Sequence, residues 1–154
     1  MSENLTLQLD RVIRAPRSSV FAAWTQPDEL LHWFAPGPMR AQSIDVDLRV
    51  GGIFRWTMQG TLPGTAEPML IAFSGVYQEI VPYELLRFSW QSEANPQDST
   101  LVTIAFSDVD GGTQVALTQE RIPTQEIYNR NSGGWSSMMD KLASLVQPVT
   151  VQAH

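Results

Sequence analysis

The chain has 154 residues, of which 43% are hydrophobic and 17% charged, and its net charge is −6. This length and composition predict one folded domain over residues 1–154, with an ordered core at about 5–146, and exclude a disordered chain. The acidic balance with a single lysine excludes nucleic-acid binding, the lack of cysteine excludes disulfides and thiolate chemistry, and the lack of a long apolar run excludes membrane insertion and favours a cytoplasmic protein.

The amino-terminal part predicts one strand and two short helices. Leucines alternate with polar residues from Leu5 onward, which is the periodicity of a strand. Pro16 and Pro27 each suit the first turn of a helix, where the missing N–H costs nothing. The second helix is expected to stop at the Pro-Gly-Pro of residues 36–38.

A run of strands follows the two helices. The predicted segments are 43–48, 53–58, 69–81, 85–91, 101–107 and 113–121. Several of them are joined by short turns, such as Gly51-Gly52 and Gly111-Gly112, and short connections favour antiparallel neighbours.

The last part of the chain predicts one long helix. Thr124 is a suitable N-cap, and a broad apolar stripe with Asn131 in it runs on through Trp135 at helical spacing. Gly133-Gly134 is costly inside a helix, so we expect either a kink or a close approach of another group to the backbone there. An alternative stays open, in which the regular helix begins after Gly134 and Ser132 caps it.

Strands followed by one long helix indicate an α+β fold, with a curved antiparallel sheet of six or seven strands wrapped around that helix. One helix cannot fill the whole concave face, so we expect an internal cavity walled by the inner face of the strands and by the helix stripe. The alternative is a packed core with no cavity. The predicted ligand-binding residues are Trp33, Phe54, Trp56, Met58, Phe73, Tyr77, Phe88, Trp90, Ile104, Phe106, Leu117, Gln119, Trp135, Met138, Met139 and Leu142.

Several segments, in their order and spacing, resemble a known family. They are Ala15-Pro16 to Ala35-Pro36, the double glycine of Gly51-Gly52-Ile53-Phe54-Arg55-Trp56, the hairpin pair Phe73–Ile80 and Leu86–Trp90, and the helix from Gly134-Trp135 to Leu145. The family is the activator of heat shock protein 90 ATPase homologue-like group of the SRPBCC (START-like) superfamily. The resemblance implies the helix-grip fold, with two short helices between the first two strands and a hydrophobic tunnel between sheet and helix.

The resemblance leaves the activity open, because the superfamily includes lipid carriers, hormone receptors, aromatase/cyclases and co-chaperone domains. One departure affects catalysis. Family members often carry a histidine near the end of the last strand, where this chain has Gln119 and Glu120. That puts proton transfer at this point in doubt, although Gln119 could hydrogen-bond a ligand.

Candidate reactive groups are few. Glu79 is the one weak catalytic candidate, because it shares strand parity with Tyr77. A position on the surface or on the rim, near the strand end, is the favoured alternative. Arg87 has the opposite parity and is expected on the outer face as a partner for Glu79. His32 and His154 lie far apart in the sequence and make a poor metal set, so no metal and no cofactor are expected.

The first functional hypothesis is therefore a module that binds a small apolar ligand, lipid-like, polyketide-like or aromatic, and binding without catalysis is favoured over an enzymatic role. The second is a cyclase or hydratase that uses Glu79, Gln119 or Tyr77 in the same cavity. The third is a chaperone-interacting module like the co-chaperones of heat shock protein 90. A homodimer is also among the partners considered.

Overall fold

The structure is a computed structural model that describes residues 4–61 and 67–146. The elements are β1 (Leu5–Ile13), α1 (Arg17–Thr25), α2 (Pro27–Trp33), β2 (Arg40–Val46), β3 (Ile53–Gly60), β4 (Met69–Val81), β5 (Leu85–Ser92), β6 (Thr100–Val109), β7 (Gly112–Ile122) and α3 (Gln125–Val146). His154, the second histidine considered above, lies outside the described residues.

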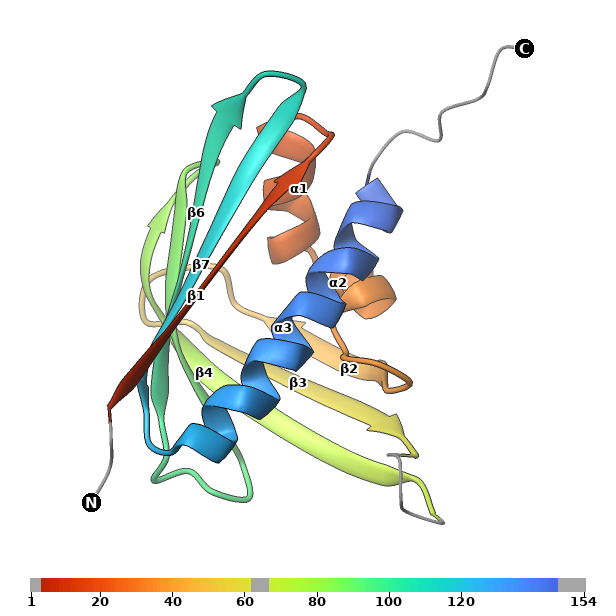
Figure 1. Ribbon diagram of the computed structural model, residues 1–154, viewed down its shortest axis with the longest axis vertical. Coiled ribbons are helices and arrows are strands. Elements are labelled where there is room, and N and C mark those ends of the chain that lie inside the picture. The colour runs from red at the N-terminus through yellow and green to blue at the C-terminus, as the bar shows by residue number, and fades with distance from the viewer. Residues whose placement is uncertain (1–3, 62–66, 147–154) are drawn as a thin grey trace.

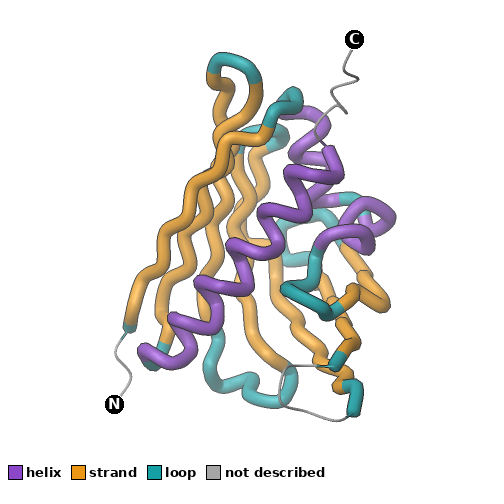
Figure 2. The backbone as a smooth tube through the Cα atoms, turned by 45° about the vertical axis from the view of Figure 1, so that its right-hand side comes forward, coloured by secondary structure: helices purple, strands orange, loops and turns teal. Residues whose placement is uncertain are grey.

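The seven strands form one antiparallel sheet in the order β1-β7-β6-β5-β4-β3-β2. The long helix α3 runs diagonally across one face of the curved sheet, and α1 and α2 lie on the same side (Figure 1). The tube view shows the strands curving around the helix (Figure 2). The predicted α+β helix-grip architecture, with two short helices between the first two strands, is confirmed.

Strand β4 has the predicted bounds, whereas β2 begins at Arg40, three residues before the predicted start. The reason is a register shift between Ala41 and Ser43 against β3, which places an extra residue in the strand. A bulge of this kind interrupts the alternation of side chains, so the periodicity is readable only after it.

Helix α3 begins as expected, because Thr124 Oγ1 accepts a hydrogen bond from the backbone N–H of Ile127 at 3.1 Å. It continues through both glycines, so the alternative start after Gly134 is wrong. A Cβ added at Gly134 would lie 3.6 Å from Pro36, and nothing lies within 4 Å of one added at Gly133. The helix therefore passes close to the loop between α2 and β2 at Gly134.

The core lies between α3 and the concave face of the sheet. Helix α3 contributes four buried residues, and strands β5, β6 and β7 contribute their alternate residues. The buried α3 residues are Trp135, Met138, Met139 and Leu142. Across residues 4–61 and 67–146, no helix is both long and apolar enough to cross a bilayer.

Candidate ligand-binding cavity

The larger of two cavities beside the core has a volume of about 490 Å³ and lies between α3, the start of β4 and the end of β5. The loop between β5 and β6 and the loop before β2 complete its rim. Its apolar lining consists of Pro36, Met39, Trp56, Met58, Met69, Ile71, Phe73, Trp90, Ala94, Ile127, Gly134, Trp135 and Met138. Its polar lining consists of Gln91, Ser92, Asn95, Asp98, Thr100, Gln119, Arg130 and Asn131.

Four aromatic rings form one wall of this cavity. Phe73 stacks on Trp56 with a centroid distance of 4.9 Å and on Trp90 at 5.0 Å. Trp135 from α3 approaches Trp90 at 5.2 Å. The strand rings are brought together by the sheet register, because Trp56 on β3 lies opposite Phe73 on β4. The result is a broad aromatic surface of the kind that binds flat apolar groups.

A chain of hydrogen bonds centred on Gln119 forms the polar side of the cavity. The indole N–H of Trp135 donates to Gln119 Oε1 at 2.9 Å, and Asn131 Nδ2 donates to the same oxygen at 3.3 Å. Gln119 Nε2 in turn donates to Thr100 Oγ1 at 2.9 Å, and Thr100 Oγ1 donates to the carbonyl oxygen of Trp90 at 3.0 Å.

Chemistry fixes the direction of this chain. An indole N–H can only donate, so the atom of Gln119 that faces Trp135 has to be the oxygen. The amide nitrogen of Gln119 therefore faces Thr100. The Thr100 hydroxyl accepts a hydrogen bond from it and donates one to the carbonyl oxygen of Trp90. Because Gln119 is fully buried, this network satisfies a polar group that would otherwise destabilise the core.

The charge of the cavity is confined to its mouth. Of the described lining residues, only Asp98 and Arg130 carry charged side chains, and both are exposed. Over the part of the chain that the structure describes, no three histidine, aspartate or glutamate side chains come together as a metal-ligating group. The interior thus presents aromatic carbon, methionine sulfur and neutral amide and hydroxyl groups.

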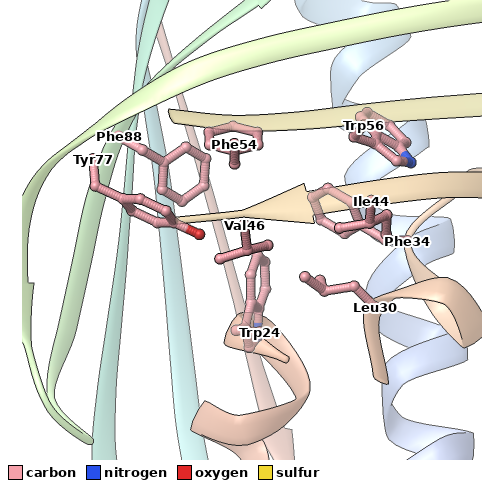
Figure 3. A pocket seen from close by; sticks show the side chains of 9 residues that line it. All are labelled: Trp24, Leu30, Phe34, Ile44, Val46, Phe54, Trp56, Tyr77 and Phe88. Carbon is pink, nitrogen blue, oxygen red and sulfur yellow. The ribbon is translucent and has the colours of Figure 1, made fainter. Parts of the chain in front are cut away.

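A smaller cavity of about 20 Å³ lies on the other side of Trp56, between β2, α2 and the inner face of the sheet. Figure 3 shows its nine lining side chains, including Phe54, Tyr77 and Phe88 from the strands. This volume suits one water molecule rather than an organic ligand. Burial raises the pKa of the Tyr77 hydroxyl here.

The predicted ligand-binding residues divide into three groups. The larger cavity is lined by Trp56, Met58, Phe73, Trp90, Gln119, Trp135 and Met138. The smaller cavity is lined by Phe54, Trp56, Tyr77 and Phe88. Neither lining includes Trp33, Ile104, Phe106, Leu117, Met139 or Leu142, all of which are buried in the core.

The positions of four residues of the third group explain why these residues line neither cavity. Met139 and Leu142 lie on the part of α3 that follows the cavity, and Ile104 lies on an inner-face position of β6, where the core is closed. Trp33 donates its indole N–H to the carbonyl oxygen of Ala23 at 3.0 Å and so fastens α2 to α1. Alternation identifies the inner face of a strand, but it does not say how far along that face the packing is closed.

Glu79 does not face either cavity. Arg87 Nη1 donates to its carboxylate at 2.6 Å, and about half of the Glu79 side chain is exposed. The parity argument fails because the register shifts between Tyr77 and Glu79, which makes Gln78 an extra residue and turns Glu79 outward. The structure shows the expected surface position, on the outer face of the sheet, and the expected pairing with Arg87.

Sequence reasoning did not select Asn131, Thr100, Met39 and Ile127 as site residues, although all four line the larger cavity. Asn131 carried a usable signal. It was the one polar position within an apolar helical stripe, and a polar residue in such a stripe usually has a buried hydrogen-bond partner.

The family model described as "Activator of Hsp90 ATPase homolog 1-like protein" matches residues 14–147. The chain belongs to this family. Its membership agrees with the resemblance drawn from the sequence motifs, and with the helix-grip fold of the SRPBCC superfamily.

Solved structures of several bacterial proteins are similar to this member of the family. Protein CV1439 from Chromobacterium violaceum is 28% identical with a TM-score of 0.80, over 94% of this chain and 99% of that one. The AHSA1-like protein from Aeromonas hydrophila is 22% identical with a TM-score of 0.75, over 97% of both chains. CalU16 from Micromonospora echinospora is 23% identical with a TM-score of 0.69, over 94% of this chain and 78% of that one. No curated protein matches the sequence.

Proposed function

We propose that this protein binds a small, largely apolar molecule in the larger cavity between α3 and the sheet. The observation that carries the proposal is the cavity itself, whose volume of about 490 Å³ falls in the range of small-molecule sites and whose apolar lining consists mainly of aromatic and methionine side chains. Methionines such as Met58 and Met138 adapt to different ligand shapes, so the site suits a class of ligands.

Hydrophobic burial supplies the driving force for this role. At about 25 cal/mol per Å² of apolar surface removed from water, burial of a modest apolar ligand supports micromolar affinity before ordering costs are subtracted. The aromatic wall of Trp56, Phe73 and Trp90 adds stacking to this burial.

Binding is a better account of the cavity than catalysis. A cyclase or hydratase needs a titratable group within hydrogen-bond reach of the substrate. Glu79 points outward, and Tyr77 lines the smaller cavity with a pKa raised by burial. Gln119 does not titrate, and its oxygen already accepts two hydrogen bonds. A cytoplasmic location, a homodimer and a chaperone partner stay predictions from the sequence.

NMR shift mapping tests the proposal. A panel of naphthalene and medium-chain fatty alcohols is titrated into the labelled protein, and backbone amide shifts are followed. The expected result is a set of perturbations centred on Trp56, Phe73 and Trp135. Perturbations confined to the outer face of the sheet, or none with any compound, would contradict it.

A matched pair of variants makes the experiment specific to the cavity. Ile127→Trp places a large ring into the lining from the first turn of α3 and should abolish the perturbations. Leu145→Trp makes a similar change at an exposed position on the same helix and should leave them unchanged. Equal binding by both variants would locate the ligand elsewhere.

A further inference from the structure

On the polar side of the larger cavity, the side-chain amide of Asn131 is held by that of Gln119 and uses only part of its own hydrogen-bonding capacity. Gln119 Oε1 accepts from both Trp135 and Asn131, which occupies its two lone pairs. Gln119 therefore offers a ligand no free acceptor. It acts instead as a fixed partner that holds the side chain of Asn131.

The bond to Gln119 sets the orientation of the Asn131 amide. Because Nδ2 of Asn131 donates to Gln119 at 3.3 Å, Oδ1 occupies the other end of the amide. Within residues 4–61 and 67–146 no group donates a hydrogen bond to Asn131 Oδ1. Asn131 is half-buried and lines the larger cavity, so a ligand there meets a carbonyl oxygen that can accept.

The charges around the cavity favour a neutral ligand group at this point. Asp98 and Arg130, the charged residues of the described lining, are both exposed at the mouth and have opposite signs. A carboxylate placed against Asn131 Oδ1 would meet another acceptor and no buried cation, which is unfavourable. A neutral hydroxyl or amide N–H would instead donate to it.

We infer that the ligand is an aromatic molecule with a neutral hydrogen-bond donor, such as a hydroxyl, that lies on the Trp56–Phe73–Trp90 wall and donates to Asn131 Oδ1. This inference rests on the proposed function and adds to it the chemical class of the ligand. Asn131 is then the residue that selects a ligand with a hydrogen-bond donor. Gln119 is the positioning residue, because it holds the Asn131 amide in place.

A series of naphthalenes that differ in one group tests the inference. Naphthalene has no polar group, 2-naphthol has a donor, 2-methoxynaphthalene has only an acceptor, and 2-naphthoate is anionic at pH 7. Dissociation constants are measured by NMR titration with wild-type protein, Asn131→Leu and Asn129→Leu. Asn129 is the matched control, because it lies on the same helix but is exposed and pairs with Gln125.

The decisive quantity is the affinity ratio of 2-naphthol to 2-methoxynaphthalene, compared between proteins so that the added methyl group cancels. One hydrogen bond predicts that Asn131→Leu lowers this ratio about three- to tenfold. Naphthalene affinity should stay within about twofold, 2-naphthoate should bind more weakly than 2-naphthol, and Asn129→Leu should behave as wild type.

Two results would overturn the inference while leaving the proposed function standing. One is an unchanged ratio in Asn131→Leu, and the other is tighter binding of 2-naphthoate than of 2-naphthol by the wild-type protein. Since the second result needs no variant, the test does not depend on the folding of Asn131→Leu. If no compound of the series or of the fatty-alcohol panel binds, the proposed function fails and the inference fails with it.

Discussion

Trp135 on α3 donates its indole N–H to Gln119 Oε1 on β7 at 2.9 Å, with both side chains almost fully buried. This bond joins the long helix to the sheet at the polar side of the cavity. Trp135 also forms part of the aromatic wall. One residue thus links the stability of the helix–sheet packing to the shape of the site.

Replacing Trp135 by phenylalanine should lower the free energy of unfolding by about 1–3 kcal/mol, because it removes a buried donor and leaves Gln119 underbonded. Trp24→Phe is the matched comparison, since the indole N–H of Trp24 has no hydrogen-bond partner within the described residues. Urea unfolding measures both variants. A loss in Trp24→Phe equal to or larger than that in Trp135→Phe would contradict this reading of the network.

Lys141 on α3 holds the loop before β2 against the helix by hydrogen bonds to its backbone. Its ammonium group donates to the carbonyl oxygens of Ala35 at 2.6 Å and Gly37 at 2.8 Å. We expect Lys141→Met to lower the free energy of unfolding by about 1–3 kcal/mol, because hydrogen bonds from a charged donor are lost. Hydrogen exchange at the Gly37 N–H should also become faster. A change in stability within about 0.5 kcal/mol, typical of a plain surface substitution, would show that the contact is not stabilising.

Glu79→Gln should leave ligand binding unchanged. Glu79 pairs with Arg87 on the outer side of the sheet, and both side chains are more than a third exposed. Exposed ion pairs contribute little, so the change in stability should stay within about 1 kcal/mol. Thermal unfolding and NMR titration with naphthalene measure the two effects. A tenfold loss of naphthalene affinity would show that Glu79 contributes to the binding site and would contradict its placement on the outer face.

Tyr77 should make the protein less stable at high pH. Burial raises the pKa of its hydroxyl above the ordinary value of about 10, so the unfolded chain releases this proton first. The stability contributed is present below pH 10 and is lost as the pH rises, by at most about 1.4 kcal/mol per pH unit. Urea unfolding between pH 8 and about 11 should show this slope in the wild type and a smaller one in Tyr77→Phe. Identical slopes would contradict a buried, protonated Tyr77.

Much of the fold was readable from sequence because its signals are local. Proline at the helix starts, the Thr124 cap and the alternation along β4 each depend on a few neighbouring residues. The bulge at Gln78 was not readable, because an extra residue is fixed by the pairing of β4 with β5 and leaves no mark of its own. That one feature decides where Glu79 points.

The site was predictable only in part for a related reason. Alternation identified the inner faces of the strands, including Trp56, Phe73 and Trp90. It could not distinguish a wall residue from a packed one such as Ile104, because that difference depends on how far α3 lies from each strand. Partners distant in sequence, such as Gln119 and Asn131, are likewise set by the docking of the helix.

The most direct test of the account is to locate a guest in the cavity. Crystals of the protein are grown with 2-bromonaphthalene, and the bromine is found by its anomalous scattering. The account predicts a peak between α3 and the sheet, against Trp56, Phe73 and Trp135. Crystals that bind the compound only on the outer face, with the space beside Trp135 filled by the protein's own side chains, would contradict it.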